Sequence, residues 1–329
     1  MEEKVEEKVV YHYCSTEVFH KIISNQKIRL SDITKSNDSM ELKWAAQYIK
    51  EIFGEKYNNE AKATKYFREN YPEDLYEDLL TRYMEDTFDD DSRYYSFYVC
   101  CFSKEGDCLS QWRGYADDGK GLSIGFDESV LSAMIDRLSS QYDMLYGAVT
   151  YNEVDQKNEI KREAQKLIEE IKKIAKEHAE KIISETDRKK KSMTEFNKVF
   201  LSIFRRCVFL KNPFFREEKE TRLCLNESKK ALDEEVRKIL KELAKKRVGI
   251  IDDEANRNII KEESLSKIEY YCRNSALVPF YDLSFDRGKA IKEVIIGPKC
   301  KASENDVETY LFNNGFRGIK VRKSNGTYQ

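Results

Sequence analysis

The sequence lacks the features that mark several large classes of protein. No apolar run approaches the roughly 20 residues that a membrane-spanning helix needs, and the charged stretch from Met1 to Lys8 has no apolar core of a secretion signal. Only 4 prolines and 13 glycines occur in 329 residues, which argues against a turn-dense all-β protein or a collagen-like one. The formal net charge of −2 excludes a strong attraction of the whole molecule to nucleic acid or anionic lipid. We therefore expect a cytoplasmic protein with no membrane partner.

Metal-binding patterns are also scarce. The chain has 3 histidines and 8 cysteines, and no two cysteines form a C-x-x-C pair. Several cysteines lie in apolar runs typical of strands, such as 99–102 and 223–225. We interpret the cysteines as reduced thiols of a cytosolic core and expect no bound metal. The alternative for one of them is a nucleophile paired with His12.

The apolar pattern predicts an α+β fold. Hydrophobic residues make up 40% of the chain and aromatic residues 12%, which is too apolar for a disordered protein. Extended runs rich in aromatic and β-branched residues alternate irregularly with helical patterns. We expect a single domain over residues 1–329 with a mixed, mainly antiparallel sheet, and helical insertions at about 55–92 and 152–200. Strands are expected at 9–14, 94–102, 121–126, 145–151, 220–225, 276–281, 291–296 and 318–321.

One insertion carries a narrow apolar seam. Its apolar residues recur at alternating spacings of four and three over about two heptads, with lysine and glutamate on the other faces. The seam consists of Ile160, Ala164, Leu167, Ile171 and Ile174. We expect a helix over 156–185 that supports a homodimer.

Two polar clusters lie near the N-terminus. The first is the strand end Tyr11-His12-Tyr13, where His12 is placed to bond a ribose or to activate a nucleophile, although a structural histidine explains it equally well. The second contains Asn37, Asp38 and Glu41. An Asx turn and a helix cap account for Asn37 and Asp38 without any function, whereas Glu41 is less well explained.

A third cluster follows the strand that ends at Ser103. Trp112, Arg113 and Tyr115 stand together in an otherwise polar segment, and the chain has only 2 tryptophans. An indole beside a fixed cation is a platform for a flat, anionic ligand such as a nucleotide. The alternative is a tryptophan that fills the edge of the sheet, with Arg113 in an ion pair.

The fourth cluster places charges on one strand. If residues 218–224 are extended, alternation puts Glu218, Glu220 and Arg222 on the same face. An arginine there is suited to bidentate binding of a carboxylate or a phosphate. A solvent-exposed edge strand with alternating charge is the alternative. A basic C-terminal segment, 320–328, either folds back over the site or frays.

These clusters also carry a family resemblance. The segments YHYCS, NDSMELKWA, CFSKEGDCLSQWRGYADDGKGLSIGF and KNPFFREEKETRL, and a C-terminal segment from Ile291 to Tyr328, occur in this order. They resemble the successive motifs of the bacterial family called domain of unknown function 2971, from about Tyr11 to Tyr328. The family name implies no activity.

A second resemblance does imply one. An aromatic-His-aromatic strand, a strand ending in Phe-Ser and a strand bearing E-x-E are similar to the ADP-ribosyltransferase superfamily, although the superfamily's Ser-Thr-Ser pattern is reduced here to residues 101–103. The resemblance implies that His12 holds the nicotinamide ribose, that Ser103 packs the site, and that Glu220 stabilises the oxocarbenium ion as nicotinamide leaves. Glu218 is the upstream member of E-x-E.

The leading hypothesis is therefore an NAD-dependent, ADP-ribosyltransferase-like enzyme, with NAD as substrate and a macromolecular acceptor of unknown identity. Arg222 and Arg113 are expected to hold the pyrophosphate, and Trp112 or Tyr13 to stack on nicotinamide. The resemblance further implies a role in phage defence or as a toxin. We expect His12, Trp112 and Glu220 to line one cleft.

Two alternatives belong to other classes. The first is a non-catalytic module that senses a nucleotide or binds a partner through the Trp112–Arg113 platform. The second is a metal-dependent nuclease whose carboxylates are Asp38, Glu41, Glu218 and Glu220.

Overall fold

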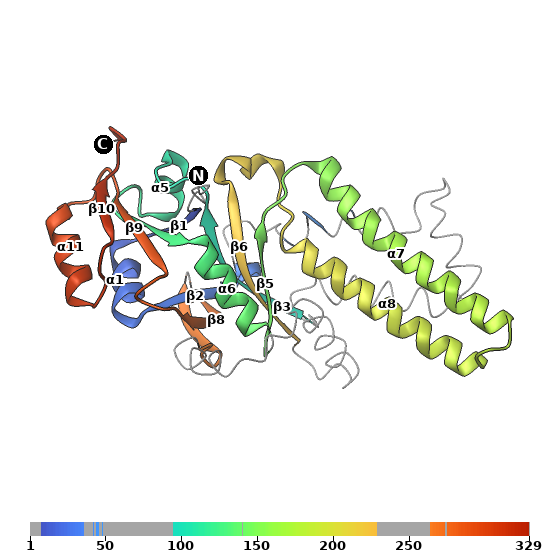
Figure 1. Cartoon of the computed structure of the whole chain (residues 1–329). Coiled ribbons are helices and arrows are strands. Elements are labelled where there is room, and N and C mark those ends of the chain that lie inside the picture. Colours follow the sequence, from blue (N-terminus) through green and yellow to red (C-terminus); the bar gives the residue numbers. More distant parts are fainter. Residues whose placement is uncertain are drawn as a thin grey trace, which may run out of the picture.

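The structure is a computed structural model that describes residues 8–35, 42, 44, 45, 48, 95–139, 141–228, 264–273 and 275–328. Its helices are α1 (Thr16–Asn25), α5 (Leu109–Tyr115), α6 (Glu128–Leu138), α7 (Glu153–Ala179), α8 (Glu185–Cys207) and α11 (Glu304–Asn313), with 3-10 helices η1 (Ile33–Lys35) and η2 (Pro213–Glu218). Its strands are β1 (Val9–Cys14), β2 (Lys27–Asp32), β3 (Tyr95–Ser103), β4 (Leu122–Asp127), β5 (Asp143–Ala148), β6 (Glu220–Ser228), β7 (Glu269–Arg273), β8 (Ala276–Ser284), β9 (Ile291–Ile296) and β10 (Lys320–Lys323). The predicted α+β class is confirmed (Figure 1).

The described strands form one mixed sheet. Its order is β10-β9-β4-β1-β3-β2-β8-β7, while β6 pairs with β3 and β5 pairs with β6. The β9–β10 pair is parallel and the other pairs are antiparallel. The expectation of a mainly antiparallel mixed sheet is therefore also confirmed.

The sheet divides at one edge of β3. Along its other edge, β3 pairs with β6 over its whole length, from Tyr95 to Ser103. On the dividing edge, β2 pairs with β3 at Tyr98 and Val99, whereas β1 pairs with it at Ser103. Strands β1 and β2 therefore leave β3 at different points. Between these points, backbone groups on this edge of β3 can form hydrogen bonds with side chains.

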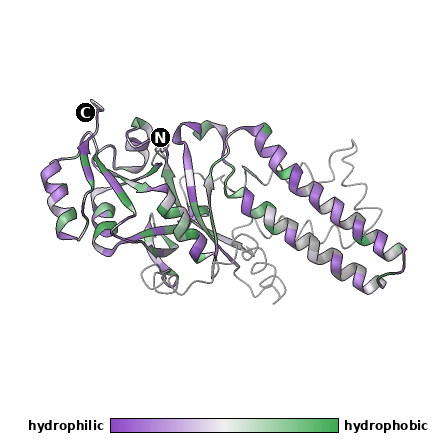
Figure 2. Ribbon diagram, in the orientation of Figure 1, coloured by the Kyte–Doolittle hydropathy of each residue, from purple (hydrophilic) through white to green (hydrophobic). Residues whose placement is uncertain are grey.

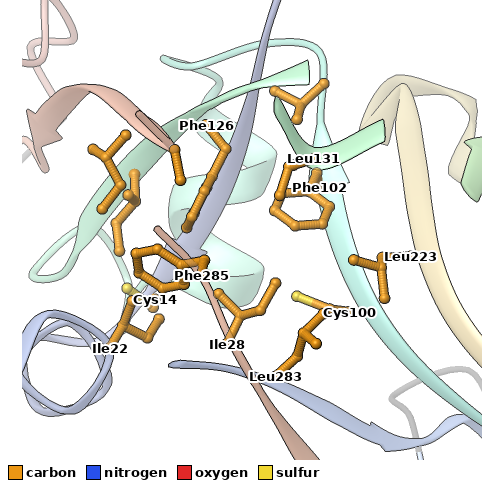
Figure 3. Packing of buried hydrophobic residues seen from close by; sticks show 14 of the residues in the cluster. Cys14, Ile22, Ile28, Cys100, Phe102, Phe126, Leu131, Leu223, Leu283 and Phe285 are labelled. Atoms are coloured by element: carbon orange, nitrogen blue, oxygen red, sulfur yellow. The ribbon is translucent and has the colours of Figure 1, made fainter. Parts of the chain in front are cut away.

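The main hydrophobic core packs helices α1, α6 and α11 against strands of the sheet. Phe126 contacts Phe102 and Phe285 with its ring edge-on, at centroid distances of 5.6 and 5.5 Å (Figure 3). Alternation along β3 turns Cys100 into this core and leaves Cys101 exposed. β3 thus anchors the core with one face, while its other face carries Phe97 and Val99 and, toward its end, Cys101 and Ser103.

Helix starts follow the capping signals in the sequence. The Ser15 side chain accepts a hydrogen bond from the Val18 amide at the start of α1. Ser303 and Asp306 form a reciprocal capping box that begins α11, as their spacing predicts. The position of α11 against the core is therefore set by a local signal.

The insertion at 152–200 is a pair of helices rather than one. α7 ends at Ala179, so the helix expected at 156–185 is too long, and α8 continues to Cys207. Lys181, with a φ of 57°, lies in the turn between them. Figure 1 shows the two helices side by side and extending away from the sheet, and Figure 2 shows hydrophilic residues predominating along α7.

The apolar seam is at least partly used within the chain. Ile160 and Ile174 are buried although no second copy is present, and α7 packs along α8. A homodimer through this helix remains a prediction. The insertion expected at 55–92 lies outside the described residues. In the described parts of the chain, none of the helices combines the length and apolar character that crossing a bilayer requires.

Candidate functional site

The candidate site is a cavity of about 140 Å³ where β1 leaves the edge of β3. Its walls come from β1, β3, α5 and the segment that leads into β6. They include His12, Tyr13, Cys101, Ser103, Tyr115, Lys211, Glu218 and Glu220. Of the three groups expected in one cleft, His12 and Glu220 line this cavity, and Trp112 does not.

His12 is held by the backbone that the divided sheet leaves available. Its Nδ1 lies 3.0 Å from the carbonyl oxygen of Cys101. A carbonyl oxygen only accepts, so Nδ1 carries the proton and Nε2 keeps a lone pair. Burial lowers the pKa of His12 despite the opposing effect of the Cys101 carbonyl. The ring is therefore a neutral hydrogen-bond acceptor or base at the cavity wall.

The strand expected at 220–225 is present, because β6 begins at Glu220. The further condition that the chain is extended from Glu218 does not hold. η2 continues through Glu218, and Lys219 adopts a left-handed conformation with a φ of 46°. Alternation along a strand therefore does not relate Glu218 to Glu220, although both glutamates line the cavity.

Lys211 joins the two glutamates and was not among the predicted site residues. Its Nζ lies 2.6 Å from Oε2 of Glu218 and 3.0 Å from Oε2 of Glu220. All three side chains are largely buried. Two carboxylates that are buried close together require a cation nearby. The lysine of the KNPFF segment is the sequence signal that could have identified it.

Arg222 is committed to the interior. Its Nε and Nη2 donate to Oε1 and Oε2 of Glu220 at 2.7 and 2.9 Å, and Nη1 donates to the Val208 carbonyl oxygen. The side chain is 0% exposed. This corrects the expectation that Arg222 holds a pyrophosphate, because its guanidinium is enclosed by protein and donates to Glu220 and Val208.

The charges around Glu220 keep it ionised. Burial alone would raise the pKa of Glu220, but the Arg222 guanidinium and the Lys211 ammonium outweigh it and hold the pKa well below its usual range. Formal charges of Glu218, Glu220, Lys211 and Arg222 sum to zero. This cluster of charged side chains therefore has no net charge, and Lys211, Glu218 and Glu220 of the cluster line the cavity beside the neutral imidazole of His12.

Tyr115 is the residue of the third cluster that reaches the cavity. It lies at the end of α5, and its hydroxyl donates to Oε1 of Glu218 at 2.8 Å. Burial and the neighbouring Glu218 carboxylate raise the pKa of this phenol. Tyr115 is 41% exposed, so it stands between the carboxylate and solvent.

Trp112 and Arg113 do not form the expected ligand platform. Trp112 is 2% exposed, its Nε1 donates to Asp107 at 2.7 Å, and its ring lies edge-on to Tyr13. Arg113 lies over the ring of Tyr328 instead. The tryptophan is buried because α5 packs its apolar face on β1, which corrects its assignment to cofactor binding. Arg113 lies outside the cavity, so its position does not support the expected contact with a pyrophosphate.

Tyr13 and Ser103 use their hydroxyl groups to shape the cavity. The Tyr13 hydroxyl donates to the Glu105 carbonyl oxygen and accepts from the Cys108 amide. The Ser103 hydroxyl donates to the Glu218 carbonyl oxygen at 2.7 Å and accepts from the Glu105 amide. Ser103 therefore holds the turn that carries Glu218, and the packing role that the resemblance implies for it remains a prediction. Both residues line the cavity, so stacking of a ligand on Tyr13 remains a prediction.

The C-terminal segment folds back beside α5. Asp107, which accepts from Trp112, also accepts from the Ser324 hydroxyl and the Asn325 amide. Tyr328 donates to Asp118 at 2.6 Å. The segment is thus tied to the loop before α5 and to the turn after it, rather than frayed.

The remaining predicted polar cluster is not described. Asn37, Asp38 and Glu41 lie outside the described residues. In the part of the chain that is described, no group of three or more His, Cys, Asp or Glu side chains is placed to hold a metal ion.

Comparison with known proteins gives a family match over part of the chain and no activity. No curated protein and no solved structure matches the chain. The matching family model covers about a third of the sequence, and its range contains Tyr115, Lys211, Glu218, Glu220 and Arg222 but not His12. Residues 111–223 match the family described as protein of unknown function (DUF2971), which supports the resemblance to that family.

Proposed function

We propose that the cavity between β1, α5 and β6 binds the nicotinamide end of NAD and breaks its N-glycosidic bond, as in an ADP-ribosyltransferase. The observation that carries the proposal is that His12 and the Glu218–Glu220 pair, far apart in sequence, line one cavity. The resemblance to the ADP-ribosyltransferase superfamily assigns sugar-binding and carboxylate roles to these same residues. The proposal therefore rests on the order of these residues in the sequence and on their common place in the cavity wall.

The chemistry places few demands on acid catalysis. The bond between ribose C1′ and the nicotinamide nitrogen breaks, and its electron pair leaves with neutral nicotinamide. The acceptor nucleophile then bonds to C1′ and releases its proton to solvent. The transition state carries positive charge on the sugar, which an ionised carboxylate in a water-poor cavity stabilises. Glu220 is the group in that role, since its pKa is held low.

The size of the cavity limits what it encloses. Typical pockets for drug-sized ligands measure about 300–1,000 Å³, whereas this one measures about 140 Å³. Only one end of a dinucleotide fits such a volume. The neutral His12 would accept a hydrogen bond from a ribose hydroxyl through Nε2, and the rest of the ligand would lie outside.

A second function, binding of a nucleotide without turnover, is favoured by one observation. Each glutamate in the cavity already has a cationic partner, Lys211 for both and Arg222 for Glu220. Such compensated charges suit a rigid binding wall as well as a catalytic one. The nuclease alternative is less favoured, because the Lys211 ammonium occupies the position between the carboxylates that a shared divalent cation would take.

Two measurements on purified protein separate these functions. Chromatographic detection of nicotinamide after incubation with NAD, with and without protein and nucleic-acid acceptors, tests turnover. Thermal shift with NAD tests binding. Turnover that is lost in Glu220→Gln, in a variant that stays folded, supports the proposal. A thermal shift without nicotinamide release supports the binding module and contradicts catalysis.

A further inference from the structure

Strand β7 lies at an end of the sheet. In the described part of the chain, the strand order ends at β7, which pairs with β8. An edge strand presents backbone N–H and C=O groups that another strand can bind. β7 has five residues, and it begins with an acidic residue, Glu269, and ends with a basic one, Arg273.

The hairpin geometry tells which backbone groups point outward. Arg273 pairs with Ala276 across a two-residue turn that includes Ser275, with a φ of 64°. Residues that flank such a turn form a hydrogen-bonded pair, and the pairs alternate along the ladder. Glu269, Tyr271 and Arg273 consequently bond to β8, whereas the N–H and C=O groups of Tyr270 and Cys272 point away. Pro279, which has no N–H, lies opposite Tyr270, as this register requires.

We propose that β7 is a homodimerisation strand that pairs antiparallel with β7 of a second copy, about a two-fold axis at Tyr271. This register makes Tyr270 face the partner's Cys272, and Cys272 face the partner's Tyr270. Both residues with outward backbone groups are then used in both copies, and the two sheets become continuous. A two-fold interface of this kind is closed, so it produces a dimer and no filament.

The charges of β7 are complementary to themselves in this register. Glu269 lies opposite the partner's Arg273, and Arg273 lies opposite the partner's Glu269. Opposite charges across an antiparallel pair stabilise it, whereas like charges destabilise it. Tyr271 faces its own copy, which adds an aromatic pair at the axis.

The other end of the sheet shows the contrast. Strand β10 carries Lys320, Arg322 and Lys323 in four residues. Antiparallel self-pairing centred on β10 would set Lys320 against the partner's Lys323, a repulsive arrangement. The two terminal strands of the sheet therefore differ in their charge pattern. Self-pairing brings like charges together in β10 and opposite charges together in β7.

An exposed apolar face accompanies the β7 edge. Ile268, Tyr270 and Leu277 are 40%, 59% and 66% exposed, and they lie on one face of the β7–β8 hairpin, with Tyr270 beside Cys272 along β7. Large apolar side chains gathered at an edge mark an interaction surface more often than isolated ones do. In the proposed dimer, the Tyr270 side chain packs beside the partner's Cys272, and part of this face is removed from water.

A cross-link tests the register directly. In the non-hydrogen-bonded pair at the axis, the two Cα atoms are about 4.5 Å apart, which suits a disulfide. Tyr271→Cys in a Cys272→Ser background should give a covalent dimer on mild oxidation, with a 271–271 disulfide in peptide mapping. The Cys272→Ser parent is the control. A dimer that does not cross-link through position 271 would place the interface elsewhere and overturn the proposal.

Charge reversal provides a second test that does not depend on an aromatic substitution. Glu269→Lys and Arg273→Glu should each weaken dimerisation in sedimentation equilibrium by about tenfold, because each puts two like-charged pairs into the interface. The double variant Glu269→Lys/Arg273→Glu restores opposite charges and should recover the wild-type dissociation constant. A wild-type chain that is monomeric at all concentrations, or a double variant no better than the single ones, would overturn the proposal.

Discussion

The guanidinium of Arg222, which is fully buried, holds the carboxylate of Glu220 at two points, with nitrogen–oxygen distances of 2.7 and 2.9 Å. A buried pair of this kind keeps the carboxylate ionised and its orientation fixed. The proposed electrostatic role of Glu220 depends on this relationship. The same ion pair therefore contributes both to the stability of the fold and to the geometry of the cavity wall.

Removal of the arginine should be severe. Arg222→Ala leaves the Glu220 charge with one cationic neighbour, Lys211, and a cavity beside it. Breaking a buried ion pair in this way costs about 3–5 kcal/mol. Urea unfolding should report this loss, whereas Lys21→Ala, which removes the exposed pair with Glu17, should leave the free energy of unfolding almost unchanged. Equal effects of the two variants would contradict the account.

The pH dependence of stability should reveal His12. Because burial lowers its pKa in the folded state, the unfolded chain binds the proton more readily. Stability therefore decreases as pH falls below the unfolded pKa of about 6.5. His12→Gln should flatten the curve of unfolding free energy between about pH 7 and 5. A wild-type slope in His12→Gln would rule out this origin.

Adjacent cysteines on β3 should react differently. Cys101 is exposed and lines the cavity, whereas burial in the core raises the pKa of Cys100 to about 12. Alkylation followed by peptide mass spectrometry should modify Cys101 and spare Cys100. NAD should slow the modification of Cys101 without affecting Cys272, which lies outside the cavity. Protection of neither cysteine at saturating NAD would argue that the ligand binds elsewhere.

A glycine makes room for the tyrosine beside His12. A Cβ at Gly106 would lie 2.5 Å from Cε1 of Tyr11, whose hydroxyl donates to Glu293. Gly106→Ala should therefore displace the ring and destabilise the fold by about 1–3 kcal/mol in urea unfolding. At Gly147 the nearest atom to an added Cβ is 3.5 Å away, in Phe209. Gly147→Ala is the matched control and should be tolerated. Comparable losses in both variants would show that the close contact is not the cause.

Most of the strands were readable from the sequence because their signals are local. The aromatic and β-branched run at 95–102 forms a strand, and the spacing of Ser303 and Asp306 begins a helix. Glu218 and Glu220 were found because two carboxylates next to a predicted strand are conspicuous. Their convergence with His12 was implied by the resemblance to the ADP-ribosyltransferase superfamily.

The parts that sequence reasoning missed depend on contacts between distant segments. Trp112 faces the core rather than a ligand because its Nε1 donates to Asp107 and its ring packs edge-on to Tyr13. Whether Arg222 serves a ligand or a neighbour is decided by its complete burial. Lys211 lies in the KNPFF segment, yet no feature of the neighbouring sequence indicates that its ammonium contacts two glutamates at once.

The most direct test of the central claim is the rate of nicotinamide release by the wild type, Glu220→Gln and Glu217→Gln. Glu217 is an exposed glutamate three residues before Glu220 and serves as the matched control. Loss of a charge that stabilises the transition state typically slows turnover by about 100-fold or more. The account predicts this loss in Glu220→Gln and a wild-type rate in Glu217→Gln. No release by the wild type, or full activity of folded Glu220→Gln, would contradict it.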